Sequence, residues 1–201
     1  MTNEIAKKAL IDYISSRVKI TKEEELLIKE CFHLKQIKKK QYFLTEGTKC
    51  FQHGFIVAGT FRVFYTDPKA AEHVLYFGFK DWWVGDIASF HTEEPSKVSV
   101  QAMEDSWILE FSKSDIEYLF SKVTSLERLF RIMAQRTLAV LQKRFLMTIS
   151  ASAEDRYLEL ISRHQGIEQL VPQHQIASYL GILPESLSRM KKQLVEKAVK
   201  K

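Results

Sequence analysis

Near the N-terminus, apolar residues recur every three or four positions. This spacing runs from Glu4 to Val18 and is typical of an amphipathic helix. Thr21 then begins the sequence T-K-E-E, in which Glu24 stands three residues after the threonine, as in a capping box. The pattern therefore predicts two helices before Leu34.

From Leu34 onward, the pattern changes to alternating runs rich in aromatic and β-branched residues. Turns with glycine or proline interrupt these runs about every 8 to 12 residues, which favours a sandwich or barrel of roughly eight strands over residues 34–111. The segment from Phe55 to Tyr65 predicts two strands around a turn at Gly59. Further strands are predicted at residues 73–79, 97–103 and 106–111.

Helical spacing returns after the strands. A short helix is predicted from Ser112 to Phe120, and a longer one from Ser125 to about Ser150, without internal proline or glycine. The apolar positions of the longer helix include Leu126, Leu129, Phe130, Met133, Val140, Leu141, Phe145 and Met147. This stripe either packs along its own β-domain or forms a two-helix seam across a dimer, and we favour the dimer. S-A-E-D at Ser152 restarts a helix, so a domain boundary is predicted at residues 149–152.

The last part of the chain has the spacing of a helix-turn-helix. A first helix is predicted from Pro172 to Leu180. Gly181 ends it, because glycine adopts a left-handed conformation at low cost. A second helix begins near Pro184, a residue tolerated in the first helical turn. The second helix has an apolar stripe of Ile182, Leu187, Met190 and Leu194, and an opposite polar face of Glu185, Ser186, Ser188, Arg189 and Lys192. A purely structural hairpin is the alternative to DNA binding.

Composition narrows the class of protein only modestly. The 201 residues suffice for one large or two small domains, and the 45% apolar content argues against disorder. A net charge of +5 suits an anionic partner, but the charge alone does not indicate that this partner is a nucleic acid. Cys31 and Cys50 are too few for a disulfide framework, a four-thiolate iron–sulfur cluster or a zinc ribbon. Without a signal segment or a long apolar run, we expect a cytoplasmic protein that does not bind a membrane.

Several motifs together resemble the cyclic-AMP receptor protein (Crp/Fnr) family of bacterial transcription regulators over nearly the whole chain. They are E-G-T at 46–48, F-I-V-A-G-T-F-R at 55–62, V-G-D-I-A-S-F at 84–90, A-E-D-R-Y at 153–157 and P-E-S-L-S-R at 184–189. The resemblance implies an α+β protein with three parts. Residues 1–124 would form N-terminal helices and an effector-sensing antiparallel β-sandwich (jelly roll), 125–150 a dimerisation helix, and 151–201 a winged helix-turn-helix whose wing is a small hairpin at 167–171.

The resemblance also implies the partners and the DNA-binding residues. A homodimer would bind a pseudo-palindromic site on double-stranded DNA and contact RNA polymerase. Glu185 and Arg189 match the family's base-reading positions, and arginine can donate two hydrogen bonds to guanine. Pro184 replaces a polar residue at the first helical position and removes one possible base contact. The residues better suited to phosphates are Gln173, His174, Ser186, Ser188 and Lys192.

The sensor motif departs from the family pattern. Cyclic-nucleotide binders have a glycine-glutamate pair and, about ten residues later, an arginine-serine pair whose arginine balances the cyclic phosphate. This chain has Gly85-Asp86, and Ser96 stands at the arginine position, followed by Lys97; a lysine does not replace a bidentate guanidinium. Val140 and Leu141 stand where the family has hydroxyls. These six residues define the expected effector pocket. We expect an unknown small-molecule effector other than cyclic AMP, or none, and predict no cofactor.

Two rival functions remain. The first is a cupin-type β-barrel enzyme with a helical tail. The sequence contains no H-x-H, G-x-S-x-G, H-E-x-x-H or phosphate loop, so no catalytic or metal-binding residue is predicted. His53, His73 and His91 are haem-ligand candidates only in the sense that every histidine is. The second rival is a degenerate binding module that dimerises but neither senses nor regulates.

Overall fold

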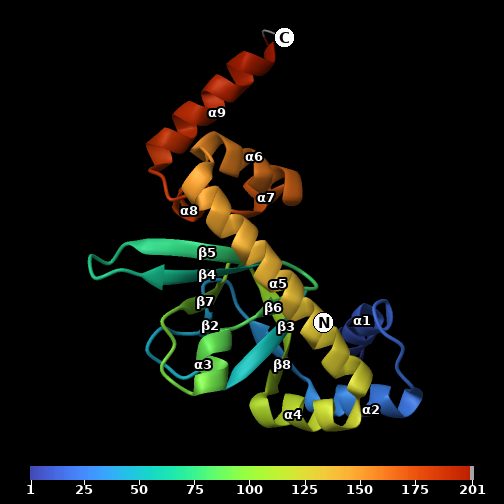
Figure 1. Ribbon diagram of the computed structural model, residues 1–201. Coiled ribbons are helices and arrows are strands. Elements are labelled where there is room, and N and C mark those ends of the chain that lie inside the picture. Colours follow the sequence, from blue (N-terminus) through green and yellow to red (C-terminus); the bar gives the residue numbers. More distant parts are fainter. Residues whose placement is uncertain (200–201) are drawn as a thin grey trace. The chain divides into compact units, whose positions relative to one another are not determined.

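The computed structural model describes residues 1–199, and the two terminal lysines of the tail lie outside the described residues. The chain divides into two compact units (Figure 1). The first unit comprises Met1–Tyr65 and Tyr76–Arg136. The second comprises Thr66–Leu75 and the chain from Thr137 onward. A short segment between two strands thus belongs to the same unit as the C-terminal helices.

Helices α1 (Asn3–Ser15) and α2 (Lys22–Cys31) confirm the two predicted N-terminal helices. The hydroxyl of Thr21 accepts a hydrogen bond from the Glu24 amide at 3.2 Å, and the Glu24 carboxylate accepts one from the Thr21 amide at 2.8 Å. This reciprocal pair satisfies two backbone donors that would otherwise lack a partner. Apolar residues of both helices, including Leu10 and Ile28, are fully buried in the core of the first unit.

Among the described residues, eight strands form two four-stranded sheets, as the alternating pattern predicts. The order is β1-β8-β3-β6 in one sheet and β2-β7-β4-β5 in the other. The pairings of β1 with β8 and of β4 with β7 are antiparallel. The strands are β1 (His33–Ile37), β2 (Tyr42–Leu44), β3 (Gln52–Ala58), β4 (Phe61–Thr66), β5 (Glu72–Gly78), β6 (Trp83–Val84), β7 (Ser99–Ala102) and β8 (Ser106–Ser112). A short helix not predicted from the sequence, α3 (Ile87–Thr92), follows β6.

The predicted turn at Gly59 joins strands that belong to different sheets. Its φ of 98° lies in the region that glycine adopts readily. A Cβ atom at this position would stand 2.1 Å from the Ser106 hydroxyl oxygen. Glycine is therefore required here both by the backbone conformation and by the close approach of β8.

The core of the first unit is an aromatic and aliphatic cluster between the sheets and the helices that cover them. Phe55, Phe61 and Ile108 are fully buried. The ring centroids of Trp83 and Phe55 lie 5.1 Å apart, and those of Trp83 and Phe130 lie 4.9 Å apart. Full burial of a side chain of this size contributes about 1.5–3 kcal/mol, so this cluster supplies much of the driving force for folding.

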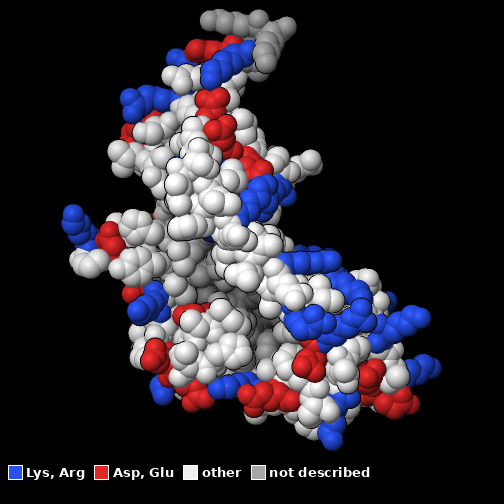
Figure 2. All heavy atoms as spheres, in the orientation of Figure 1, with Lys and Arg blue, Asp and Glu red and all other residues white. Residues whose placement is uncertain are grey.

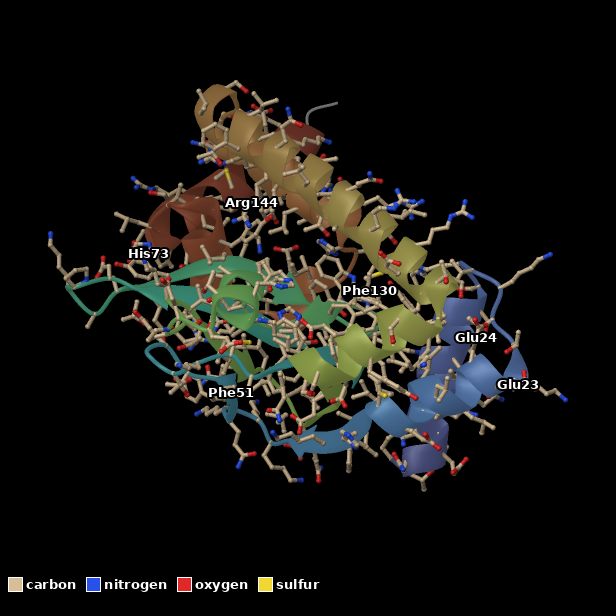
Figure 3. All side chains as sticks on the ribbon, turned by 60° about the horizontal axis from the view of Figure 1, so that its bottom comes forward. Glu23, Glu24, Phe51, His73, Phe130 and Arg144 are labelled. Carbon is tan, nitrogen blue, oxygen red and sulfur yellow. The ribbon has the colours of Figure 1, made fainter. Side chains whose placement is uncertain are left out.

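Helices α4 (Lys113–Lys122) and α5 (Thr124–Ser150) follow β8 and confirm the predicted short and long helices. The first half of α5 packs on the core through Leu126 and Leu129, and Phe130 points toward the strands (Figure 3). The second half exposes large apolar side chains, and the surface visible there is largely uncharged (Figure 2). Among the described residues, no helix is long and apolar enough to cross a membrane.

The second unit contains four further helices: α6 (Ala153–Arg163), α7 (Ile167–Leu170), α8 (Gln173–Leu180) and α9 (Pro184–Val199). Ser152 and Asp155 form a capping box at the start of α6. Gly181 ends α8 with a φ of 69°, as predicted, and α9 begins at the predicted proline. The helix-turn-helix spacing is therefore confirmed.

The prediction of a wing hairpin at residues 167–171 is wrong. The backbone forms α7 there, and the described chain from residue 113 to 199 contains no strand. Gly166 enters the helix with a φ of 81°, and the Val171 amide donates to the Ile167 carbonyl at 2.8 Å. Five residues are too few for two strands and a turn, and burial of Ile167 favours one helical turn.

Candidate nucleic-acid interface and sensor site

Helices α8 and α9 pack closely through apolar side chains. Ile176, Ala177 and Leu180 of α8 are buried, and so is Leu187 of α9. At the turn, the Ile182 amide donates to the Ala177 carbonyl at 3.0 Å, which satisfies an acceptor at the end of α8. The buried side of each helix is thereby fixed.

Seven of the eight side chains predicted to bind DNA are exposed in the described structure. Gln173 and His174 open α8, whereas the other six residues belong to α9. Glu185 and Arg189 lie four residues apart on α9, which places them on one helix face. Ser186 is the exception because it is half-buried. The exposed residues are Gln173, His174, Pro184, Glu185, Ser188, Arg189 and Lys192.

Helix α7 anchors α9 from the position where a wing was predicted. The Lys191 ammonium pairs with the Glu168 carboxylate at 2.5 Å, and the Tyr157 hydroxyl donates to the same carboxylate at 2.8 Å. The hydrogen bond from Lys191 lowers the pKa of Glu168. Arg156 donates to the Leu180 carbonyl at 3.1 Å and so ties α6 to the end of α8. Sequence analysis quoted Arg156 and Tyr157 within a motif but assigned them no contact, and it assigned none to Lys191.

The predicted sensor residues Gly85, Asp86 and Ser96 lie together beside α3. One carboxylate oxygen of Asp86 accepts hydrogen bonds from the amides of Ala88 at 3.0 Å and Ser89 at 3.4 Å. The other accepts one from the Ser96 hydroxyl at 2.8 Å. Ser96 is only 2% exposed. The aspartate therefore engages the first amides of α3 and the nearby hydroxyl.

The other three predicted pocket residues are exposed. Lys97 is exposed immediately after Ser96. Val140 and Leu141 are exposed on α5 and belong to the second compact unit. Participation of these three residues in an effector pocket stays a prediction.

Two aromatic residues that sequence analysis did not place also surround Gly85. A Cβ atom on Gly85 would stand 2.5 Å from the ring of His53. The Tyr76 hydroxyl donates to the Gly85 carbonyl at 3.3 Å, and burial raises the pKa of Tyr76 to about 12. Nε2 of His53 is buried without a hydrogen-bond partner. No spacing signal connects these residues, because they approach Gly85 from different strands.

Metal ligands are not clustered in the part of the chain that the structure describes. No group of three or more histidine, cysteine, aspartate or glutamate side chains is placed to hold an ion there. Cys31 and Cys50 are free and buried, as expected of isolated thiols.

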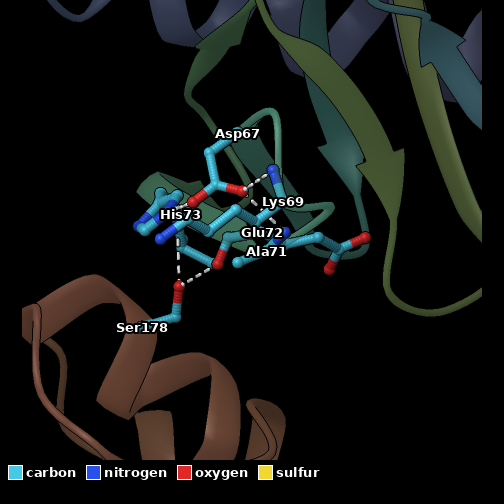
Figure 4. A network of polar contacts seen from close by, with 7 residues as sticks. Asp67, Lys69, Ala71, Glu72, His73 and Ser178 are labelled. Carbon is cyan, nitrogen blue, oxygen red and sulfur yellow. Dashed lines mark hydrogen bonds and ion pairs between the residues drawn. The ribbon is translucent and has the colours of Figure 1, made fainter.

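In the second unit, the segment between β4 and β5 contacts α8 (Figure 4). The Asp67 carboxylate accepts hydrogen bonds from the amides of Lys69 at 2.8 Å and Ala71 at 2.9 Å, and lies 3.0 Å from Nε2 of His73. The hydrogen bond with His73 is the main cause of the lowered pKa of Asp67. The Ser178 hydroxyl of α8 bonds to the backbone of Glu72 and Val74 in β5. The sequence pattern did not indicate this contact.

Comparisons with known proteins show a match of the β-domain to one family model and a likeness of the fold to several solved structures. Residues 34–123 match the family described as the cyclic nucleotide-binding domain. The structure of FixK2 from Bradyrhizobium japonicum is similar, with a TM-score of 0.69, 15% identity, and coverage of 83% of this chain and 86% of that one. No curated protein matched the chain in a sequence search.

Two further solved structures have the same fold. The c-di-GMP responsive global regulator CLP of Xanthomonas campestris gives a TM-score of 0.67 at 15% identity, covering 89% of this chain and 93% of that one. A putative transcriptional regulator of the Crp/Fnr family from Eubacterium rectale gives a TM-score of 0.67 at 14% identity, covering 89% of this chain and 85% of that one. These likenesses do not favour a cupin-type enzyme.

The half-buried His53, whose Nε2 is buried without a hydrogen-bond partner, predicts a pH-dependent stability. Burial lowers its pKa from 6.5 to about 4, so the unfolded chain takes up the proton first and stability falls as the pH drops from 6.5 toward 4. We expect the native protein to lose roughly 2 kcal/mol more than His53→Phe between about pH 7 and about pH 5. Urea denaturation of both proteins at each pH measures this difference. If the free energy of unfolding changed with pH equally in both proteins, His53 would not be held neutral in the folded state.

Proposed function

We propose that the protein is a homodimeric, sequence-specific DNA-binding regulator of transcription, because residues 34–123 match the cyclic nucleotide-binding domain family and the chain has the fold of solved Crp/Fnr regulators. The observation that carries this proposal is that α9 has an exposed polar face, while its other face packs on α8 through the buried Leu187. DNA and a second copy of the chain are its partners, and RNA polymerase is a further partner by the same likeness.

The chemistry of α9 suits reading of base edges. Arg189 can donate two hydrogen bonds to guanine, and Glu185, one turn earlier, can accept one from cytosine or orient the arginine. Gln173, His174 and Lys192 are exposed polar or basic side chains suited to phosphates, as are the hydroxyls of Ser186 and Ser188. Pro184 starts the helix without an amide donor, which narrows what its first turn can contact.

Dimerisation is supported by the second half of α5. Leu138, Phe145 and Ile149 are 68%, 66% and 69% exposed. They follow one another at spacings of seven and four residues, so they form a stripe along one side of the helix. A contiguous exposed apolar stripe marks an interaction site, and a second copy of α5 is the occupant that a coiled-coil seam provides. A dimer with two-fold symmetry would bind a pseudo-palindromic DNA site with its two copies of α9 about 34 Å apart.

For the sensor, we propose an effector other than cyclic AMP, or none. The Asp86 carboxylate already accepts hydrogen bonds from two α3 amides and from Ser96. A cyclic phosphate at the same donors would meet a like charge. Lys97 is the neighbouring cation, but an ammonium lacks the planar pair of donors that a guanidinium offers to a phosphate.

The DNA-binding proposal predicts different effects for two substitutions. Arg189→Ala should weaken binding to a selected DNA site by about 10- to 100-fold and relax specificity, because a base contact is lost. Lys192→Ala is the matched control and should weaken binding to all sequences alike, since phosphates carry no sequence information. Sequence selection from a random DNA pool and footprinting at fixed salt measure both. Equal affinity of Arg189→Ala and the native protein for the site would refute the assigned role, and failure to enrich any sequence would support the degenerate module.

The dimer proposal predicts dissociation when charge enters the α5 stripe. Phe145→Asp should yield monomers, because a buried unpaired carboxylate costs several kcal/mol, roughly the scale of many protein associations. Leu26→Asp is the matched control, since Leu26 is an exposed apolar residue on α2. Sedimentation velocity distinguishes monomers from dimers for both variants and the native protein. A Phe145→Asp protein that stays dimeric would move the dimer interface away from this stripe.

The effector proposal predicts that cyclic AMP leaves thermal stability unchanged. A ligand present at about 100 times its Kd stabilises the folded state by about 2.7 kcal/mol, which would raise the Tm by several degrees. We expect no such rise at about millimolar cyclic AMP in a thermal melt. If the native protein is stabilised and Lys97→Ala is not, Lys97 serves in place of the arginine and our interpretation of Ser96 is wrong.

A further inference from the structure

Strand β5 ends its sheet, so one row of its backbone groups has no partner strand. The Ser178 hydroxyl of α8 bonds to two of these groups (Figure 4). It donates to the Glu72 carbonyl at 2.7 Å and accepts from the Val74 amide at 3.0 Å. Backbone groups two residues apart project to the same side of a strand. A single side chain thus satisfies an exposed donor and an exposed acceptor of the strand.

The two sides of this contact are held in place by other interactions. On the hairpin side, Asp67 accepts hydrogen bonds from two turn amides and contacts His73, which orders the chain before Glu72. On the helix side, Arg144 of α5 bonds to the Leu75 carbonyl, and its guanidinium lies 4.2 Å from the centroid of the Tyr179 ring. Hairpin segment, α5 and α8 therefore form one connected set within the second unit.

The contact occupies the part of α8 that DNA is proposed to use. Ser178 lies four residues after His174, so the two side chains share one face of the helix. His174 is exposed and is proposed to approach a phosphate, whereas Ser178 on the same face bonds to the hairpin. We propose that the Ser178 contact is an autoinhibitory latch: the β4–β5 hairpin and DNA compete for this face of α8.

This inference rests on the proposed DNA-binding function and adds its regulation. In the latched state, the hairpin backbone restricts the approach of a phosphate backbone along α8. Breaking the two hydrogen bonds of Ser178 shifts the population toward the open state. Apparent DNA affinity rises in proportion to the open fraction, as for any protein whose competent state is only partly populated.

The test compares Ser178→Ala with the native full-length protein. Hydrogen exchange at the Val74 amide should accelerate, because this amide loses its acceptor. Affinity for a DNA site selected from a random pool should rise by about threefold to tenfold, the scale expected for two net hydrogen bonds when only part of their free energy opposes binding. Asp67→Ala, which loosens the hairpin without altering α8, should raise affinity in the same direction.

Ser162→Ala is the matched control, since Ser162 is an exposed serine on α6 whose hydroxyl donates to the Glu159 carbonyl of the same helix. It should change neither Val74 exchange nor DNA affinity. Faster Val74 exchange with unchanged or weaker DNA binding in Ser178→Ala overturns the latch, and so does unchanged exchange. If the native protein and Ser178→Ala both bind no DNA, the proposed function itself fails, and the exchange data show separately whether the contact exists.

Discussion

The continuous helix α5 places one physical constraint on the rest of the structure. Its first half completes the core of the first unit through Leu126 and Leu129. Its second half exposes Leu138 and Phe145, whose apolar surface remains in contact with water. A helix that is stabilised by burial at one end and incompletely buried at the other needs a second apolar surface to finish its packing. The proposed dimerisation would provide this surface and would also duplicate α9.

Local signals allowed much of the fold to be predicted. The capping boxes at Thr21 and Ser152 depend only on residues within one turn, so their geometry follows from the sequence. Gly181 ends α8 because its own conformational freedom is the determining property. The alternating pattern predicted the strands, but it could not assign neighbouring strands to different sheets. That assignment depends on which strands pair across the chain, and such pairings join residues far apart in sequence.

The polar face of α9 followed from helical spacing alone, whereas the residues beside α3 were predicted from the likeness to a known family. Asp86 and Ser96, ten positions apart in the chain, are joined by a hydrogen bond in the structure. His53 and Ser178 were missed because their contacts join positions distant in sequence, and no periodicity indicates them. The wing was predicted from its place in the family pattern, whereas the short segment after Gly166 buries Ile167 through a single helical turn.

The replacement of the wing by α7 has an electrostatic consequence. Glu168 brings a negative charge next to α9 and pairs with Lys191, which α9 would otherwise offer to a phosphate if it binds DNA as proposed. Each phosphate that a protein neutralises releases condensed counterions, and the number released sets how steeply affinity falls with salt. A regulator with fewer backbone contacts loses less affinity as ionic strength rises. It depends correspondingly more on base contacts to distinguish its site from the surrounding DNA.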